Sequence, residues 1–127
     1  MKKTIQYLMM LSLSLMATSC YYDEIPYEAV APLPETVSYQ SDIQPLWNQS
    51  CISCHKPGAT APDLTAANSY LALTANNKYV VPGNVANSIL HKSLIGEGAP
   101  LMPTDGKWSD SKIALVDKWI NDGALNN

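Results

Sequence analysis

Residues 51–55, CISCH, are the stretch of the chain whose residue types and spacing point most directly to chemistry. Two thiols, Cys51 and Cys54, stand two residues apart, and an imidazole, His55, follows the second thiol directly. Three kinds of chemistry use such a group: a redox disulfide, part of a zinc site, or attachment of a haem through both sulfurs. The rest of the chain has to discriminate between them.

Two of these chemistries find little support elsewhere in the sequence. A thioredoxin-like disulfide stands at the start of a helix that follows a strand, whereas here the pair follows a predicted helix and no parallel-strand pattern is present. A structural zinc ion needs four ligands. With Cys20 assigned to another role below, the only further candidate is His91, and the 35 residues between the two histidines do not fit compact finger spacings. Both chemistries stay open as alternatives.

The order C-x-x-C-H is typical of covalently attached c-type haem. Each thiol adds to one vinyl group of the haem to form a thioether, and two intervening residues on a helical turn place the sulfurs at the separation of the vinyls. His55 then lies under the iron as the proximal axial ligand. The motif therefore predicts one haem c, held by Cys51, Cys54 and His55.

The methionines of the chain suggest the second axial ligand. Four of the five lie at positions 1, 9, 10 and 16, inside the predicted leader described below, so Met102 is the only thioether of the remaining chain. It lies in the loop APLMPTD, between Pro100 and Pro103, whereas a core methionine normally lies on a helix or strand at apolar spacing. We predict Met102 as the distal iron ligand, with His91 or an open position as alternatives.

The N-terminal segment has the layout of a secretory signal peptide. Two lysines precede an apolar run from Ile5 to Ala17, which leads into small residues before Cys20. This run is too short for a comfortable transmembrane helix. The segment LMATSC resembles the lipobox of bacterial lipoproteins, which implies that residues 1–19 are removed and that Cys20 carries the lipid.

Residues 20–36 are predicted to be an extended tether. The stretch YYDEIPYEAVAPLPE contains three prolines and four acids and has neither helical nor strand periodicity. Without residues 1–19 the chain keeps six lysines and all eleven acids, a net charge of −5. Because the chain also has no arginine and no basic cluster, a nucleic-acid-binding surface is not expected.

Residues 37–127 are predicted to form one all-α domain of short helices with long connections. Apart from the short YVV stretch, no segment of five or more residues alternates cleanly between apolar and polar. About 90 residues with four brief helices bury limited apolar area. A bound prosthetic group is therefore expected to be part of the core.

Helices are predicted on both sides of the chemical motif. The first starts at Ser41, which forms a capping-box pattern with Gln44, and runs into Cys51. The last starts after Ser109 and ends at Gly123, a typical C′ glycine. Between them, a short helix is predicted over residues 66–74, and another is predicted to open at Asn87 or Ser88 and to end at Gly96.

Taken together, these segments resemble a class I c-type cytochrome over residues 37–124. SDIQPLWNQSCISCH resembles the N-terminal helix and haem-binding run, APLMP the loop of the axial methionine, and WSDSKIALVDKWINDGA the C-terminal helix of small exported haem domains. The resemblance implies the cytochrome c fold, with short helices wrapped around one covalently attached haem. It implies crossing of the first and last helices, so that Leu46 or Trp47 meets Trp119 or Ile120. The site residues that it implies are Cys51, Cys54, His55 and Met102.

The expected function is transfer of single electrons between redox protein partners, such as a dehydrogenase or an oxidase, by Fe(II)/Fe(III) cycling. With both axial positions filled, the iron has no position for oxygen or peroxide, so an enzymatic role is not expected. The alternatives are a small peroxidase-like haem enzyme with an open distal site, where His91 would have to serve as acid or base, and a non-haem zinc-binding module. The expected location is outside the cytoplasm, with the lipid at the periplasmic membrane face, the outer membrane or the cell surface.

Overall fold

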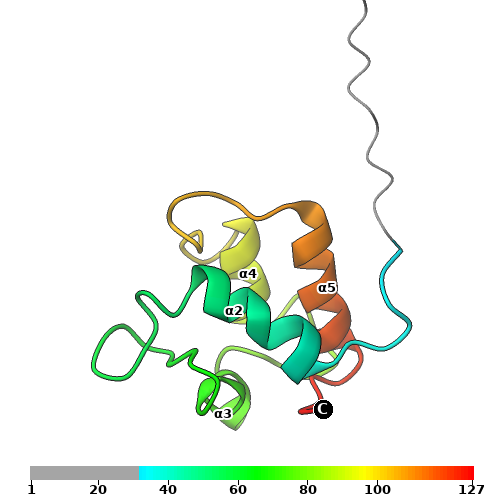
Figure 1. Cartoon of the computed structure of the whole chain (residues 1–127). Helices are drawn as coiled ribbons and strands as arrows, with labels where there is room; N and C mark the ends of the chain where they lie inside the picture. The colour runs from blue at the N-terminus through cyan, green and yellow to red at the C-terminus, as the bar shows by residue number, and fades with distance from the viewer. Residues whose placement is uncertain (1–31) are drawn as a thin grey trace, which may run out of the picture.

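The computed structural model describes residues 32–127, and in this part of the chain the protein is a small all-α domain of four α-helices without a strand. This confirms the predicted class. The helices are α2 (Gln44–Ser50), α3 (Ser69–Thr74), α4 (Ile89–Ile95) and α5 (Asp110–Asn121). A π-helical segment, η2 (Tyr39–Ile43), leads into α2, and a 3₁₀ turn, η3 (Ala75–Asn77), follows α3. Figure 1 shows α2 in front of α4 and α5, with α3 below.

The first helical segment starts earlier than its sequence pattern predicts. Ser38 is the N-cap, because its Oγ accepts a hydrogen bond from the amide of Ser41 and its own amide donates to Asp42 Oδ2 at 2.8 Å. These reciprocal bonds satisfy two backbone donors that a helix start leaves open. The cap predicted at Ser41 is therefore wrong. Gln44 does not reach back toward Ser41, and its side chain is buried in the core instead.

The second helix starts three residues later than predicted. Residues 65–68 form a turn before α3, and Asp63 holds this turn. Its carboxylate accepts hydrogen bonds from the amide and hydroxyl of Thr65 and from Nδ2 of Asn68. These bonds lower the pKa of Asp63 below its ordinary value, with the Thr65 hydroxyl as the largest cause. The side chain thus competes with the helix for the backbone of this segment.

The two later helices follow the sequence pattern closely. Ser88 is the N-cap of α4, and Gly96 ends that helix in the left-handed conformation with φ of 74°. Ser109 precedes α5, and the buried residues of α5 are Ile113, Val116, Trp119 and Ile120. Their spacing forms one apolar stripe that faces the core.

The core is organised around an aromatic group at the start of the first helical segment. Tyr39 is fully buried, with its ring centroid 5.1 Å from that of Trp119 on α5 and 5.2 Å from that of Tyr70 on α3. Trp47 stacks on Trp108 instead, at 5.8 Å. The predicted contact between the first and last helices is thus made by η2 and α5, with Tyr39 as the aromatic partner of Trp119.

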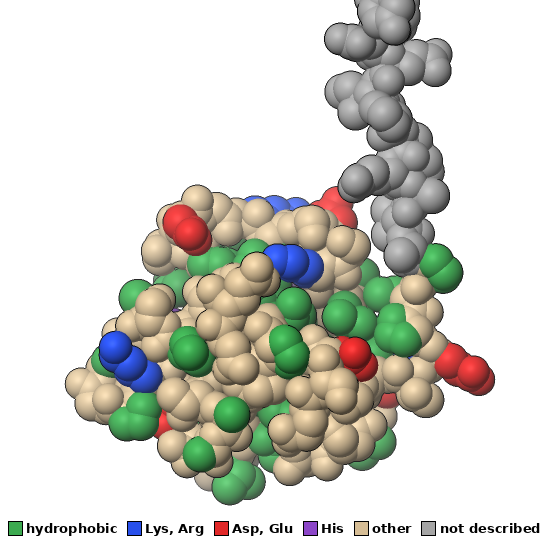
Figure 2. Space-filling model, viewed as in Figure 1, with side chains coloured by type: hydrophobic (Ala, Val, Ile, Leu, Met, Phe, Trp, Pro, Cys, Tyr) green, Lys and Arg blue, Asp and Glu red, His purple; other side chains and the backbone are tan. Residues whose placement is uncertain are grey.

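Among the described residues, the folded domain begins at Val37. Residues 32–36 are exposed, and Val37 is the first buried residue, at 4% exposure. The predicted leader, Cys20 and most of the predicted tether lie outside the described residues. Within residues 32–127 no helix has both the length and the apolar character that crossing a bilayer requires. Figure 2 shows apolar and a few charged side chains scattered over the face drawn, with no gathering of lysines.

Candidate functional site

A cavity of about 610 Å³ brings the predicted site residues together. Its volume lies within the range of roughly 300–1,000 Å³ that is usual for cofactor and ligand pockets. Cys51, Cys54, His55 and Met102 all contribute to its wall, although 47 positions of sequence separate the last two. The remaining walls come from α2, α3, α4 and their loops, through Trp47, Ser50, Ser53, Thr60, Ala61, Pro62, Leu64, Leu73, Tyr79, Ile89, Leu90, Ser93, Leu94, Pro103, Thr104 and Asp105.

The two cysteines lie where α2 unwinds into a turn. The amide of Cys51 donates to the Trp47 carbonyl at 2.9 Å, and the amides of Cys54 and His55 donate to the Cys51 carbonyl at 3.1 and 2.9 Å. The chain therefore keeps turning through the motif, which holds both thiols and the imidazole near one wall. Both thiols are unpaired, and burial raises the pKa of Cys51 to about 11. Cys51 is therefore a protonated thiol at neutral pH, unlike the thiolate of a redox-active pair.

The His55 imidazole is oriented by a backbone carbonyl. Its Nδ1 lies 3.2 Å from the carbonyl oxygen of Pro62. Because a carbonyl oxygen only accepts hydrogen bonds, Nδ1 donates this bond, and in the neutral ring Nε2 then keeps its lone pair. The loop that carries Pro62 is closed by two backbone bonds, from the amide of Leu64 to the His55 carbonyl and from the amide of Thr60 to the Cys54 carbonyl. This is the arrangement of a metal-ligating histidine with an orienting partner.

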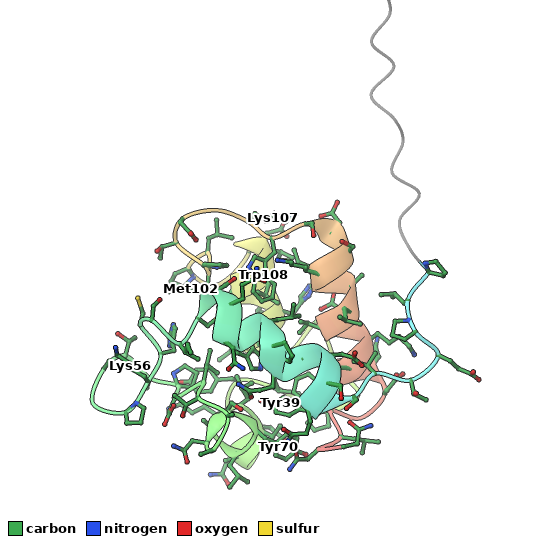
Figure 3. All side chains as sticks on the ribbon, viewed as in Figure 1. Tyr39, Lys56, Tyr70, Met102, Lys107 and Trp108 are labelled. Carbon is green, nitrogen blue, oxygen red and sulfur yellow. The ribbon has the colours of Figure 1, made fainter. Side chains whose placement is uncertain are left out.

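The loop that carries Met102 is attached to α4 by a backbone hydrogen bond. The amide of Met102 donates to the Ser93 carbonyl at 2.9 Å. At the end of α4, Gly96 turns the chain with a positive φ, and a Cβ built at this glycine would lie 3.3 Å from Cδ1 of Leu101. The close approach of Leu101 to Gly96 brings the next residue back toward the cavity. Figure 3 shows Met102 beside the C-terminal end of α2.

His91, the alternative distal ligand, is directed elsewhere. It lies on α4, but it is not among the residues that line the cavity. Its Nδ1 is 2.7 Å from Oδ1 of Asp117 on α5, and both side chains are about one-fifth exposed. The side chain thus links α4 to α5. The structure brings Met102 to the cavity with His55, and it does not bring His91 there.

Zinc coordination has a weak geometric basis in the described residues. Residues 32–127 contain no group of three or more His, Cys, Asp or Glu side chains placed to hold one metal ion. Asp105 is the only carboxylate in the cavity wall. Four-coordinate zinc would need His91 as a ligand beside Cys51, Cys54 and His55, and His91 does not line the cavity.

Several wall residues could not be identified from sequence. Pro62 acts through its carbonyl and Leu64 through its backbone, so their side-chain types carry no signal of the role. Tyr79 lies between α3 and α4, where its amide and carbonyl bond to Leu73 and Leu90. Trp47 is fully buried, and its Nε1 is the one buried side-chain polar atom of the described residues without a hydrogen-bond partner.

Comparison with known proteins adds no assignment: the chain matches no protein-family model, no curated protein and no solved structure.

Proposed function

We propose that this protein is a monohaem c-type cytochrome of the class I fold that carries single electrons between redox proteins. The observation that carries the proposal is the convergence of CISCH and Met102 on one apolar-walled cavity. An imidazole with a free Nε2, a thioether and two neighbouring thiols form a donor set suited to a covalently bound haem.

The residues fit this group in their chemistry. Cys51 and Cys54 would form the two thioethers, His55 would bind the iron through Nε2, and Met102 would bind it through sulfur. A haem c supplies one-electron Fe(II)/Fe(III) cycling when it is bound. The apolar side chains of the wall, which include Leu64, Leu73, Leu90 and Leu94, would give a bound haem surroundings of low polarity, and this together with a sulfur ligand would favour the reduced state.

The proposed role is electron transfer and not catalysis, because His55 and Met102 would both bind the iron and leave it no free position for a substrate. A peroxidase-like enzyme would need an acid or base on the distal side, and His91 is held by Asp117 outside the cavity. The redox partners, such as a dehydrogenase or an oxidase, and the lipid anchor at Cys20 belong to the same proposal. An exported, membrane-tethered domain would serve partners at the membrane surface.

The first experiment is a visible spectrum of residues 36–127 produced with haem-attachment machinery, in the ferric and ferrous states. We expect a low-spin c-type spectrum, haem that stays on the chain under denaturing conditions, and the weak red-end band of Met-ligated ferric iron. A spectrum without haem absorption would refute the proposal and return CISCH to thiol or zinc chemistry.

A variant pair tests the distal ligand. Met102→Ala should abolish the red-end band, lower the midpoint potential and let an added ligand such as imidazole bind the iron. Glu97→Ala, at an exposed position of the same connection that does not line the cavity, should keep the band and exclude the added ligand. Unchanged behaviour of Met102→Ala would favour an open distal site and the enzymatic alternative.

A further inference from the structure

A buried chain of polar side chains lies behind the wall that carries His55. Tyr39 Oη donates to Ser69 Oγ at 2.7 Å, and Ser69 Oγ donates to Oε1 of Gln44. Tyr39 and Ser69 are 0% exposed and Gln44 is 4% exposed. Burial raises the pKa of the Tyr39 phenol above its ordinary value of 10.0, so this hydroxyl is protonated at neutral pH and serves as a donor. Burying three polar side chains in so small a core is costly unless each one is satisfied.

Gln44 connects this chain to the wall of the cavity. Its Nε2 donates to the Leu64 carbonyl at 3.1 Å and to Oδ1 of Asn48 at 2.9 Å. Because a carbonyl oxygen cannot donate, the bond to Leu64 fixes which end of the amide faces the loop. Ser69 donates the third hydrogen bond, to Oε1 of the same amide. Together the three bonds hold the Gln44 side chain in one orientation.

Leu64 in turn closes the loop that orients the imidazole. Its amide donates to the His55 carbonyl at 2.9 Å, and Pro62, two residues earlier, offers its carbonyl to Nδ1 of His55. The backbone of Leu64 is therefore held at two points. Gln44 donates to its carbonyl, and its amide donates to the His55 carbonyl. A shift of Leu64 would move the Pro62 carbonyl relative to the His55 ring.

We propose that Gln44, supported by Ser69 and Tyr39, is a positioning residue for the proximal histidine, fixing the Pro62 carbonyl that holds the His55 ring in its ligating tautomer and orientation. This inference rests on the proposed function, because the ring orientation matters for an iron ligand. It assigns Gln44, Ser69 and Tyr39 a role beyond packing. The hydrogen bond at Nδ1 makes the imidazole a better electron donor, which favours ferric iron.

The test compares three variants of the haem-loaded protein that cut the chain at different distances from His55. Gln44→Met removes every bond of the amide at nearly constant volume, Ser69→Ala removes its support, and Tyr39→Phe removes only the outermost hydroxyl. The readouts are hydrogen exchange of the His55 Nδ1 proton by NMR and the midpoint potential. We expect exchange to accelerate roughly ten-fold in Gln44→Met, the effect of losing the one buried hydrogen bond that ties this amide to the Leu64 carbonyl. The acceleration should be smaller in Ser69→Ala and smallest in Tyr39→Phe. The midpoint potential should rise in the same order.

Val116→Ala is the matched control, because Val116 is fully buried on α5 and does not line the cavity. It should lower stability without changing Nδ1 exchange or the potential. If the control and Gln44→Met change exchange equally at equal loss of stability, the chain is only structural and the inference is overturned. If Gln44→Met does not fold, the graded effects of Ser69→Ala and Tyr39→Phe decide by the same criterion.

Failure of the proposed function is detected separately. A chain that takes up no haem refutes the cytochrome assignment, and ¹⁵N shifts of the His55 ring in the protein as isolated then test the positioning alone. A single Nδ1–H tautomer that becomes mixed in Gln44→Met supports the positioning role, whereas identical shifts in both proteins overturn it.

Discussion

The domain has two regions built by different means, a helix-packed core and a loop-built cavity wall. In the core, η2 and α5 meet through Tyr39 and Trp119, and apolar side chains from several elements fill the space between them. The cavity wall consists largely of residues 51–64 and 101–105, which belong to no helix. The core is filled by side chains, whereas the wall presents donor atoms to a cavity. Four residues belong to both regions: Trp47, Leu64, Leu73 and Leu94.

The same contrast separates the two histidines. His55 is held by a backbone carbonyl of the wall and faces the cavity, while His91 is held by the Asp117 carboxylate and joins two helices. Both have Nδ1 engaged, so the hydrogen bond alone does not distinguish a ligand from a structural residue. The two rings differ in their location, because His55 lines the cavity and His91 does not. Substitutions in the two regions should therefore affect different properties.

The largest effect is expected at the wall, from Cys51→Ser combined with Cys54→Ser. Without the thiols no covalent bond to a haem can form, so haem should be lost under denaturing conditions and the wall should lose its order. A haem stain after denaturing electrophoresis measures this. Ser53→Ala, an exposed position between the cysteines, should retain the stain. Retained covalent haem in the double variant would contradict the assignment of the thiols.

Next in size is a truncation in the core. Trp119 is 1% exposed, has its ring centroid 5.1 Å from that of Tyr39 in a tilted arrangement, and donates from Nε1 to the Leu125 carbonyl. Trp119→Ala should lower the free energy of unfolding by about 3–5 kcal/mol, measured by denaturant titration. The spectrum of the folded fraction should remain that of the parent protein, because Trp119 does not line the cavity. A changed axial-ligand band at low denaturant would show that the two regions are not separate.

A smaller effect is expected where the regions join, at Gly96. Gly96→Ala forces a residue with Cβ into a left-handed conformation, at about 1–2 kcal/mol, and also presses on Leu101. Gly58→Ala is the matched control, since Gly58 has a similar φ of 77° but nothing within 4 Å of the added Cβ. We expect both variants to lose stability and only Gly96→Ala to perturb the Met102 band. Equal spectra would argue that Leu101 is not a determinant of the loop.

The smallest effect is a pH dependence of stability from Asp63. Hydrogen bonds, led by that from the Thr65 hydroxyl, lower the pKa of this carboxyl in the folded state below its ordinary value of 3.8. Its contribution is fully present above that ordinary value and is lost as the pH falls through the lowered pKa. Asp63→Asn should therefore flatten the acid limb of the stability curve, measured by thermal unfolding from pH 5 downward. An unchanged limb would remove Asp63 from the acid response.

Much of this molecule could be predicted from local pattern. The apolar stripe of α5, the glycine that ends α4 and the all-α class follow from periodicity and capping residues, because these act within a few residues of each other. CISCH and Met102 stood out by residue type alone. Local pattern does not locate the start of the first helical segment, because Ser38 and Ser41 are both acceptable caps and the choice depends on Asp42 and on where Gln44 is buried.

What the sequence determined by itself was the donor set and the helical class, since thiols, an imidazole and a lone thioether are visible as letters and helices depend on local spacing. Only the tertiary structure decided which donors share a cavity. Sequence favoured Met102 over His91 by its place between two prolines, but which of the two side chains lines the cavity depends on the fold of a loop onto α4 and on a carboxylate on α5. The role of Pro62 and the buried path through Gln44 were likewise invisible, because backbone carbonyls have no residue-type signature and long-range hydrogen bonds exist only once the chain has packed.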